Sequence, residues 1–354
     1  MTWTRREFLA TAGAAVPAVA LAQPNAAAQP ERVAFYLIGD THFFANAANP
    51  KELDAASRVV TTRLVDQLNR LVGTQIPEAA GGGTVQTPRG LIHAGDMIDT
   101  GDKNGPAARA MQETEWRAFE SQYGLTGRDG RLRYPVYEVH GNHDAPAGQG
   151  LAIDEIRRRN KQRPGVTRIS ENGLHYSWDW GPVHFINLGI VVGQDRNVGR
   201  RRRYPPLESL GFLSEDLGRV RDPHQPIVIT HHVDVARYCD ACDPNAEARN
   251  QEWDPCDVRS YYDAIKERNV VALLYGHTHV RNVFRWNGTK ERVQQGIPVF
   301  NTDNASHYRD KNQAFLYFEI GAEELIAREF GTRDAWDTGE WTPQVWRVPI
   351  RKRG

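Results

Sequence analysis

The stretch VAFYLIGDTH, residues 33–42, decides the fold, because a run of apolar and aromatic residues ends in Gly39, Asp40 and His42. Such a run, bounded by glycine, is typical of a strand that is buried on both faces of its sheet. Four more runs end in the same way, and they read GLIHA, YPVYEVH, PIVIT and VVALLY. Because strand ends that point into one crevice are how an α/β sheet builds a site, we expect the five polar clusters to meet.

The clusters that follow these runs are rich in carboxylates and imidazoles. They are Gly39-Asp40-Thr41-His42, Gly95-Asp96-Met97-Ile98-Asp99, Gly141-Asn142-His143-Asp144, Thr230-His231-His232 and Gly276-His277-Thr278-His279. In a two-metal hydrolase the ions lie about 3.5–4 Å apart and share a bridging ligand, which a carboxylate can supply and an imidazole nitrogen cannot. Asp96 directly follows a strand and a glycine, so it is the natural bridge. The sequence therefore predicts a hydrolytic enzyme with two metal ions.

In this order, with a strand before each, the clusters resemble the signature blocks of the calcineurin-like metallophosphoesterase superfamily. The resemblance covers most of residues 33–304. It implies a mixed α/β fold in which two mixed β-sheets pack as a sandwich flanked by helices, in four αββα layers. The chain agrees with that fold, since helical patterns alternate with strand runs and several strands form hairpins rather than crossovers.

The resemblance also implies which side chains hold the metals. One metal would be bound by Asp40, His42, Asp96 and His279, and the other by Asp96, Asn142, His231 and His277. In Thr230-His231-His232 either imidazole could bind, and we predict His231 because the family usually uses the residue directly after the strand. His232 is then expected beside the metals or the substrate. Mixed nitrogen and oxygen ligands suit Mn, Fe or Zn better than Mg or Ca, and the identity of the metals stays open.

His143 is not used as a ligand in this scheme. In relatives the equivalent imidazole contacts the phosphate and can protonate the leaving oxygen, which suits a group that titrates near neutral pH. Asp99 is the predicted partner that orients His143, and Asp144 is the competing partner. The implied reaction is the hydrolysis of a phosphate ester by a hydroxide that bridges the metals. His307 could also approach the site, with a purely structural placement as an equal alternative.

Departures from the family's patterns narrow the substrate class. Purple acid phosphatases place a tyrosine where Asp99 stands, and the Ser/Thr protein phosphatases have Arg-Gly where this chain continues with Thr100. We therefore expect a phosphodiesterase or phosphatase of broad type, with the phosphodiesterase preferred. The alternatives are a phosphomonoesterase of the same fold and a homologue that binds metal without turnover.

The charge balance argues against nucleic acid as a partner. The chain has 44 Lys and Arg against 44 Asp and Glu, so it carries no global field that would attract a polyanion. The expected substrate is a small molecule or a lipid headgroup that contains a phosphoester. In the arginine run 200–203, Arg201 and Arg202 are candidates for contacting an anionic substrate, although a solvated charge run is the commoner outcome. No apolar run is long enough to span a membrane.

The first 31 residues are predicted to lie outside the folded domain. Thr4-Arg5-Arg6-Glu7-Phe8-Leu9 is a twin-arginine pattern, and an Ala-rich apolar stretch follows it to Ala22. We therefore predict a twin-arginine signal peptide over 1–22, a linker over 23–31 and a single metallophosphoesterase domain over 32–350. The expected partner is the twin-arginine export machinery, and the expected location is periplasmic or secreted.

Helical patterns and one long loop complete the prediction. Apolar residues three and four apart predict helices over 50–72, 106–123, 152–162, 207–220 and 256–269. Asn287-Gly288 predicts a tight hairpin after a strand at 280–286. Residues 233–257 form an insertion loop beside the fourth cluster, so this loop is a candidate lid or binding loop. For its cysteines a disulfide is favoured over a zinc site in an exported protein, and they are Cys239, Cys242 and Cys256.

Overall fold

The structure is a computed structural model that describes residues 32–195, 203–238 and 252–351. The predicted signal peptide and linker lie outside the described residues, as do Arg201, Arg202, Cys239 and Cys242. Cys256 is exposed and forms no disulfide with another described residue. The predictions of export, of substrate contacts by the arginine run and of cysteine pairing therefore stay predictions.

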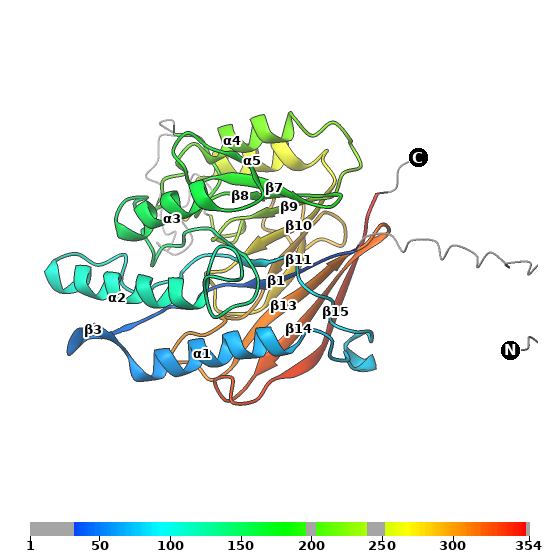
Figure 1. Cartoon of the computed structure of the whole chain (residues 1–354). Coiled ribbons are helices and arrows are strands. Elements are labelled where there is room, and N and C mark those ends of the chain that lie inside the picture. The colour runs from blue at the N-terminus through cyan, green and yellow to red at the C-terminus, as the bar shows by residue number, and fades with distance from the viewer. Residues whose placement is uncertain (1–31, 196–202, 239–251, 352–354) are drawn as a thin grey trace, which may run out of the picture. The chain divides into compact units, whose positions relative to one another are not determined.

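The first of two large β-sheets has six strands (Figure 1). They are β1 (Val33–Ile38), β4 (Leu91–His93), β5 (Val136–Glu138), β13 (Gln313–Ile320), β14 (Glu324–Thr332) and β15 (Glu340–Pro349). Their order in the sheet is β15-β14-β13-β1-β4-β5. β1, β4 and β5 are parallel, and the other three strands pair antiparallel, so the sheet is mixed as predicted.

The second large sheet has seven strands and is also mixed. They are β6 (Val166–Ile169), β7 (Tyr176–Trp180), β8 (Val183–Asn187), β9 (Ile227–Thr230), β10 (Val270–Tyr275), β11 (Asn282–Trp286) and β12 (Ile297–Asn301). Their order is β11-β12-β10-β9-β8-β7-β6, and the parallel strands β12, β10, β9 and β8 lie together in it. A separate short hairpin joins β2 (Ala45–Asn46) and β3 (Asn49–Leu53).

β1 shows how the sequence produces the layers. Phe35 and Leu37 point into the core between the two sheets, where Phe35 meets Phe185 of the second sheet edge-on. Tyr36 and Ile38 point the other way, into the core beneath the helices. Burying one such side chain stabilises the fold by about 1.5–3 kcal/mol. A strand covered on both faces is therefore apolar at every position, which explains the uninterrupted run in the sequence.

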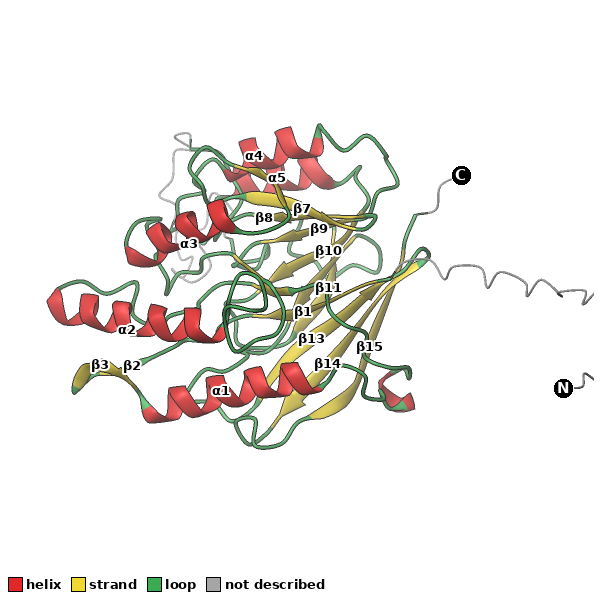
Figure 2. Ribbon diagram, in the orientation of Figure 1, coloured by secondary structure: helices red, strands yellow, loops and turns green. Residues whose placement is uncertain are grey.

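Helices cover the outer face of each sheet, so the predicted αββα arrangement is confirmed (Figure 2). The first sheet is covered by α1 (Ala55–Arg70), α2 (Pro106–Gln122) and α3 (Leu151–Gln162), and the second by α4 (Ser209–Leu217) and α5 (Pro255–Ile265). A short 3-10 helix spans Glu78–Ala80. None of the helices that the structure describes has both the length and the apolar character needed to cross a membrane.

Two local predictions are wrong. Residues 50–53 lie in β3 rather than in the first helix, and α1 begins after Asp54, whose carboxylate accepts hydrogen bonds from the N–H groups of Ala56 and Ser57. An aspartate at this capping position stabilises a helix start. The predicted tight turn at Asn287-Gly288 is a longer connection, because Trp286 pairs with Ile297 when β11 and β12 form their hairpin.

The fold brings the predicted clusters to the ends of parallel strands. Three clusters follow β1, β4 and β5 of the first sheet, and two follow β9 and β10 of the second. Parallel strands end at the same edge of a sheet, so each sheet presents its clusters on one side.

Candidate metal centre

Hydrogen bonds between the clusters show that the strand ends of both sheets meet. The Asp40 carboxylate accepts from the His277 N–H, with oxygens at 2.9 and 3.0 Å, and thereby joins a cluster of the first sheet to one of the second. The His143 N–H donates to Asp96 Oδ1 at 2.7 Å. Backbone donors thus hold both buried carboxylates in place.

The backbone at five predicted ligands is held in the left-handed region. Nine described residues other than glycine have a positive φ, and five of them are Asp40 (55°), His42 (44°), Asp96 (55°), His277 (74°) and His279 (53°). This conformation is uncommon for residues with a side chain and costs about 1–3 kcal/mol at each position. Five such residues at the strand ends indicate that the direction of these side chains is maintained at the cost of backbone strain.

Glycine is required at two positions where the backbone approaches a carboxylate. A Cβ atom at Gly141 would overlap Asp96 Oδ1, and one at Gly276 would lie 2.7 Å from Asp40 Oδ2. Any side chain at either position would displace one of the carboxylates. The glycines of these clusters therefore permit close approach to the acids.

The first group of donor atoms that could hold an ion contains Asp40, His42 and Asp96. His279 joins it, since its Nε2 lies 3.1 Å from His42 Nε2 and 3.5 Å from Asp40 Oδ1. His42 Nδ1 donates to Asp99 Oδ1 at 3.0 Å, because an ionised carboxylate can only accept. The other nitrogen of His42 therefore faces the group with a lone pair, which is the form that binds a metal.

The second group contains Asp96, His232 and His277. His232 Nδ1 lies 2.7 Å from the Ala94 carbonyl oxygen, which can only accept, so Nδ1 carries the proton. Its Nε2 lies 3.1 Å from Asn142 Oδ1 and 3.3 Å from Asp96 Oδ2. One ring nitrogen and two oxygens thus converge, and this set of donor atoms fits a cation.

The electrostatics of the site also favour a cation. Burial alone would raise the pKa of Asp96, but the imidazoles of His232 and His42 lower it well below its usual value. Burial would lower the pKa of His232, but Asp96 and Asp40 raise it to about 9. The carboxylates are therefore ionised, and their field attracts positive charge to His232. A divalent ion bound between these carboxylates and His232 would supply the same positive charge.

His231 does not reach the site, so its predicted place as a ligand is corrected to His232. The His231 ring is buried among three aromatic rings, with centroids at 5.4 Å from Trp253, 5.6 Å from Tyr261 and 6.5 Å from Tyr275. Burial lowers the pKa of His231 to about 3, so the ring is neutral. Successive residues along an extended chain point to opposite sides, which leaves His231 against the aromatic ring of Tyr261 and turns His232 toward Asp96.

The structure also corrects the predicted contact between Asp99 and His143. The Asp99 carboxylate accepts from His42, whereas His143 Nδ1 lies 3.1 Å from the Asp99 backbone carbonyl. Asp144 is not the partner of His143 either, because its carboxylate accepts from three backbone N–H groups. Burial would lower the pKa of His143, but Asp96 and the Asp99 carbonyl raise it on balance.

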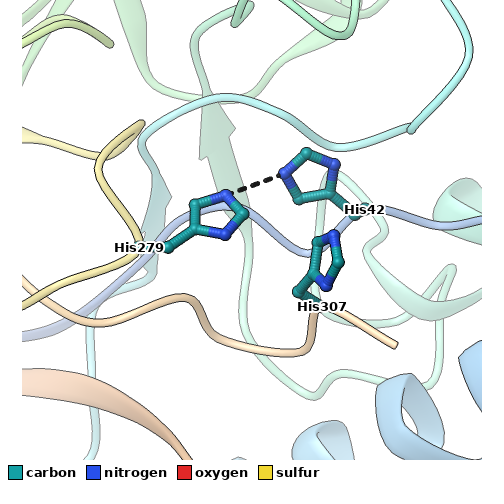
Figure 3. Close-up of side chains that lie close together, drawn as sticks. All are labelled: His42, His279 and His307. Atoms are coloured by element: carbon teal, nitrogen blue, oxygen red, sulfur yellow. Dashed lines mark hydrogen bonds between the residues drawn. The ribbon is translucent and has the colours of Figure 1, made fainter. Parts of the chain in front are cut away.

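His307, which the sequence could not place, belongs to the site (Figure 3). Its ring centroid lies 4.8 Å from that of His42 and 5.2 Å from that of His279. Burial, with the nearby imidazoles of His42 and His279, lowers the pKa of His307 to about 4, so the ring is neutral. Its chain segment follows β12, which lies parallel to β10, and this shared strand direction brings His307 to the same edge.

One more carboxylate reaches the site from outside the five clusters. Both oxygens of Glu252 lie near His277 Nε2, at 3.0 and 3.1 Å. Glu252 belongs to none of the sequence motifs. Its position in the insertion loop predicted beside the fourth cluster is the one feature of the sequence that indicates a place near the site.

Comparisons with known proteins agree with this fold. Residues 33–281 match the family model described as calcineurin-like phosphoesterase. No curated protein matches the chain as a relative. A dimetal phosphatase from Danio rerio is similar in structure with a TM-score of 0.51 and 14% identity, over 90% of this chain and 99% of that one. PhoD is similar with a TM-score of 0.50 and 10% identity, over 92% of this chain and 73% of that one.

Replacing the two neighbouring histidines separately tests the corrected placement. We expect His232→Leu to lose one of two bound metal ions, because Nε2 of His232 faces the donor group. His231→Leu should keep both ions, because its ring packs among aromatic side chains. Elemental analysis of the Mn²⁺-loaded proteins measures the metal content, and circular dichroism checks the fold. A folded His231→Leu protein that lacks an ion would contradict the placement.

Proposed function

The chain belongs to the calcineurin-like phosphoesterase family, because the family match spans residues 33–281. We propose that it is an exported enzyme that hydrolyses phosphodiesters. Membership of this family makes it a metal-dependent hydrolase of phosphoric esters that uses two divalent metals. The observation that carries the proposal is the position of Asp96, which belongs to both groups of donor atoms. A carboxylate shared by two groups is what a bridged pair of ions requires.

The donor set fits two ions with ordinary ligand chemistry. We assign Asp40, His42, Asp96 and His279 to one ion, and Asp96, Asn142, His232 and His277 to the other. Mixed nitrogen and oxygen donors of this kind suit Mn, Fe or Zn. When bound, such ions polarise phosphoryl oxygens and lower the pKa of water, which makes water a nucleophile near neutral pH.

We assign proton transfer to His143. Its backbone N–H donates to Asp96 Oδ1 at 2.7 Å and its ring Nδ1 donates to the Asp99 carbonyl at 3.1 Å, so the backbone and the ring are each held at one point. Nε2 is then the atom that can give a proton to the leaving oxygen. Asp96 and Asp99 outweigh the effect of burial and raise the pKa of His143, which favours the protonated form that a general acid needs.

The charge around the site supports a diester as the substrate. A phosphodiester carries one negative charge. A phosphomonoester has a second pKa of about 6, so it carries nearly two negative charges at neutral pH. Arg203 and Arg237 both pair with Glu252, the carboxylate that contacts His277, so their charge is partly balanced within the protein. We therefore propose a small molecule or a lipid headgroup with a phosphodiester as the substrate class.

The first experiment compares hydrolysis of bis(4-nitrophenyl) phosphate with that of 4-nitrophenyl phosphate by the Mn²⁺-loaded protein. We expect kcat/KM for the diester to be at least about tenfold higher, a difference of about 1.4 kcal/mol in transition-state binding. A chelator should abolish the activity and Mn²⁺ should restore it. A preference for the monoester would make the protein a phosphomonoesterase, and no hydrolysis with both ions bound would contradict the proposed reaction.

His143→Ala tests the proton donor. We expect kcat to fall by about 10²–10⁴-fold, the usual contribution of a positioned acid or base. Metal content should stay unchanged, because the backbone N–H that holds Asp96 remains. His224→Ala is the matched control, since His224 lies outside the donor groups, and it should keep full activity. Normal turnover in His143→Ala, or loss of an ion, would rule out the assigned role.

Export is proposed from the twin-arginine pattern and the apolar stretch that follows it, residues 4–22. Replacing both Arg5 and Arg6 with lysine should leave the protein in the cytoplasm, because the arginine pair is the feature that defines this signal. Fractionation of cells that express wild type or the double variant measures the outcome. Equal amounts of both proteins outside the cytoplasm would refute export by this route.

A further inference from the structure

Three donors converge on the buried carboxylate of Glu252. Its side chain has 0% exposure. His277 Nε2 lies 3.0 and 3.1 Å from its two oxygens, Arg203 Nη1 lies 2.8 Å from Oε1, and Arg237 Nε donates to Oε2. A carboxylate removed from water costs several kcal/mol unless it is paired and hydrogen-bonded. The three donors come from separate parts of the chain and offset that cost, so they define one specific place for Glu252.

The hydrogen bond from His277 to Glu252 determines which nitrogen of His277 is left to bind a metal. An ionised carboxylate accepts and does not donate, so Nε2 carries the proton and Nδ1 keeps its lone pair. His277 belongs to the donor group of Asp96 and His232, and none of the groups found among the described residues includes Glu252. Because Nε2 faces Glu252, Nδ1 is the nitrogen that is left for the group of Asp96 and His232.

Glu252 is held by its neighbours independently of the site. The N–H groups of Glu252 and Trp253 both donate to the Arg237 carbonyl at 3.2 Å. The Trp253 ring stacks on Tyr261 of α5, with centroids 5.9 Å apart, and meets His231 edge-on at 5.4 Å. The aromatic contact with Tyr261 thus fixes the chain segment that carries Glu252.

We propose that Glu252 is a positioning residue that turns Nδ1 of His277 toward the second metal, and that Arg203 and Arg237 hold its carboxylate for this task. This inference rests on the proposed function, because it assumes the two-metal centre that is assigned there. Outer carboxylates of this kind orient a metal-binding imidazole and raise its basicity, and their loss weakens metal affinity by about 10–100-fold. Glu252 and Arg237, which lie in the two described ends of the predicted insertion loop, therefore both serve the metal centre.

The test compares Glu252→Gln with Glu319→Gln in the full chain. Glu319 is also a buried carboxylate paired with a guanidinium, that of Arg328, but it lies in β13 outside the donor groups. Mn²⁺ affinity is measured by competition with a chelator. We expect Glu252→Gln to weaken one of the two ions by about 10–100-fold and to leave the other unchanged. Glu319→Gln should leave both affinities unchanged.

Two further measurements separate positioning from other roles. In a His277→Ala background, Glu252→Gln should cause no additional loss of affinity, because Glu252 acts through that ring. In the Zn²⁺-loaded wild type, ¹⁵N NMR of the histidines should show His277 protonated at Nε2. A metal bound at Nε2, unchanged affinity in Glu252→Gln, or an equal loss in Glu319→Gln would overturn the inference.

A milder variant protects the test against misfolding. The Arg203 side chain is 45% exposed, so Arg203→Gln perturbs Glu252 without placing a new buried group. This variant should weaken the affinity for the same ion to a smaller extent.

Wild type that binds fewer than two ions would contradict the metal centre itself. Wild type that binds two ions and hydrolyses no phosphoester would contradict the proposed function and leave the role of Glu252 standing.

Discussion

Asp96 is an ionised carboxylate buried where the two sheets end, and the arrangement of the site follows from the need to balance its charge. Such a group is costly to bury, so the surrounding residues must supply donors and space for cations. The His143 N–H, the imidazole of His232 and the close approach of Gly141 all meet that need. The left-handed backbone at Asp96 adds strain, which the packed apolar strands on both sides can tolerate.

Three of the histidines assigned to the metals donate a hydrogen bond from one ring nitrogen to an oxygen acceptor. Two of these histidines are assigned to the second metal and one to the first. Asp99 holds His42, the Ala94 carbonyl holds His232 and Glu252 holds His277. The outer acceptor determines which ring nitrogen keeps a lone pair, so it matters as much as the strand that carries the ring. Asp99 lies in the second cluster and Ala94 directly precedes that cluster, whereas Glu252 comes from the predicted insertion loop.

The fold and most of the site could be predicted because the signals are local. A six-residue apolar run ending in glycine and aspartate identifies a strand covered on both faces, and the burial of every residue of β1 agrees. The αββα layers follow from five such runs with helical patterns between them. The start of α1 was predicted too early, because the Asp54 cap outweighs the helical pattern that precedes it.

The sequence by itself determined the strands, the order of the clusters and the residue types offered to the metals, because alternation, glycine and strand ends act over a few residues. Tertiary structure decided which way each ring points. His231 packs against Tyr261 of α5, whereas His232 faces Asn142 in the site. The parallel pairing of β12 with β10 brought in His307, and the fold laid Glu252 against His277. These outcomes depend on contacts between distant segments, and no local pattern carries that information.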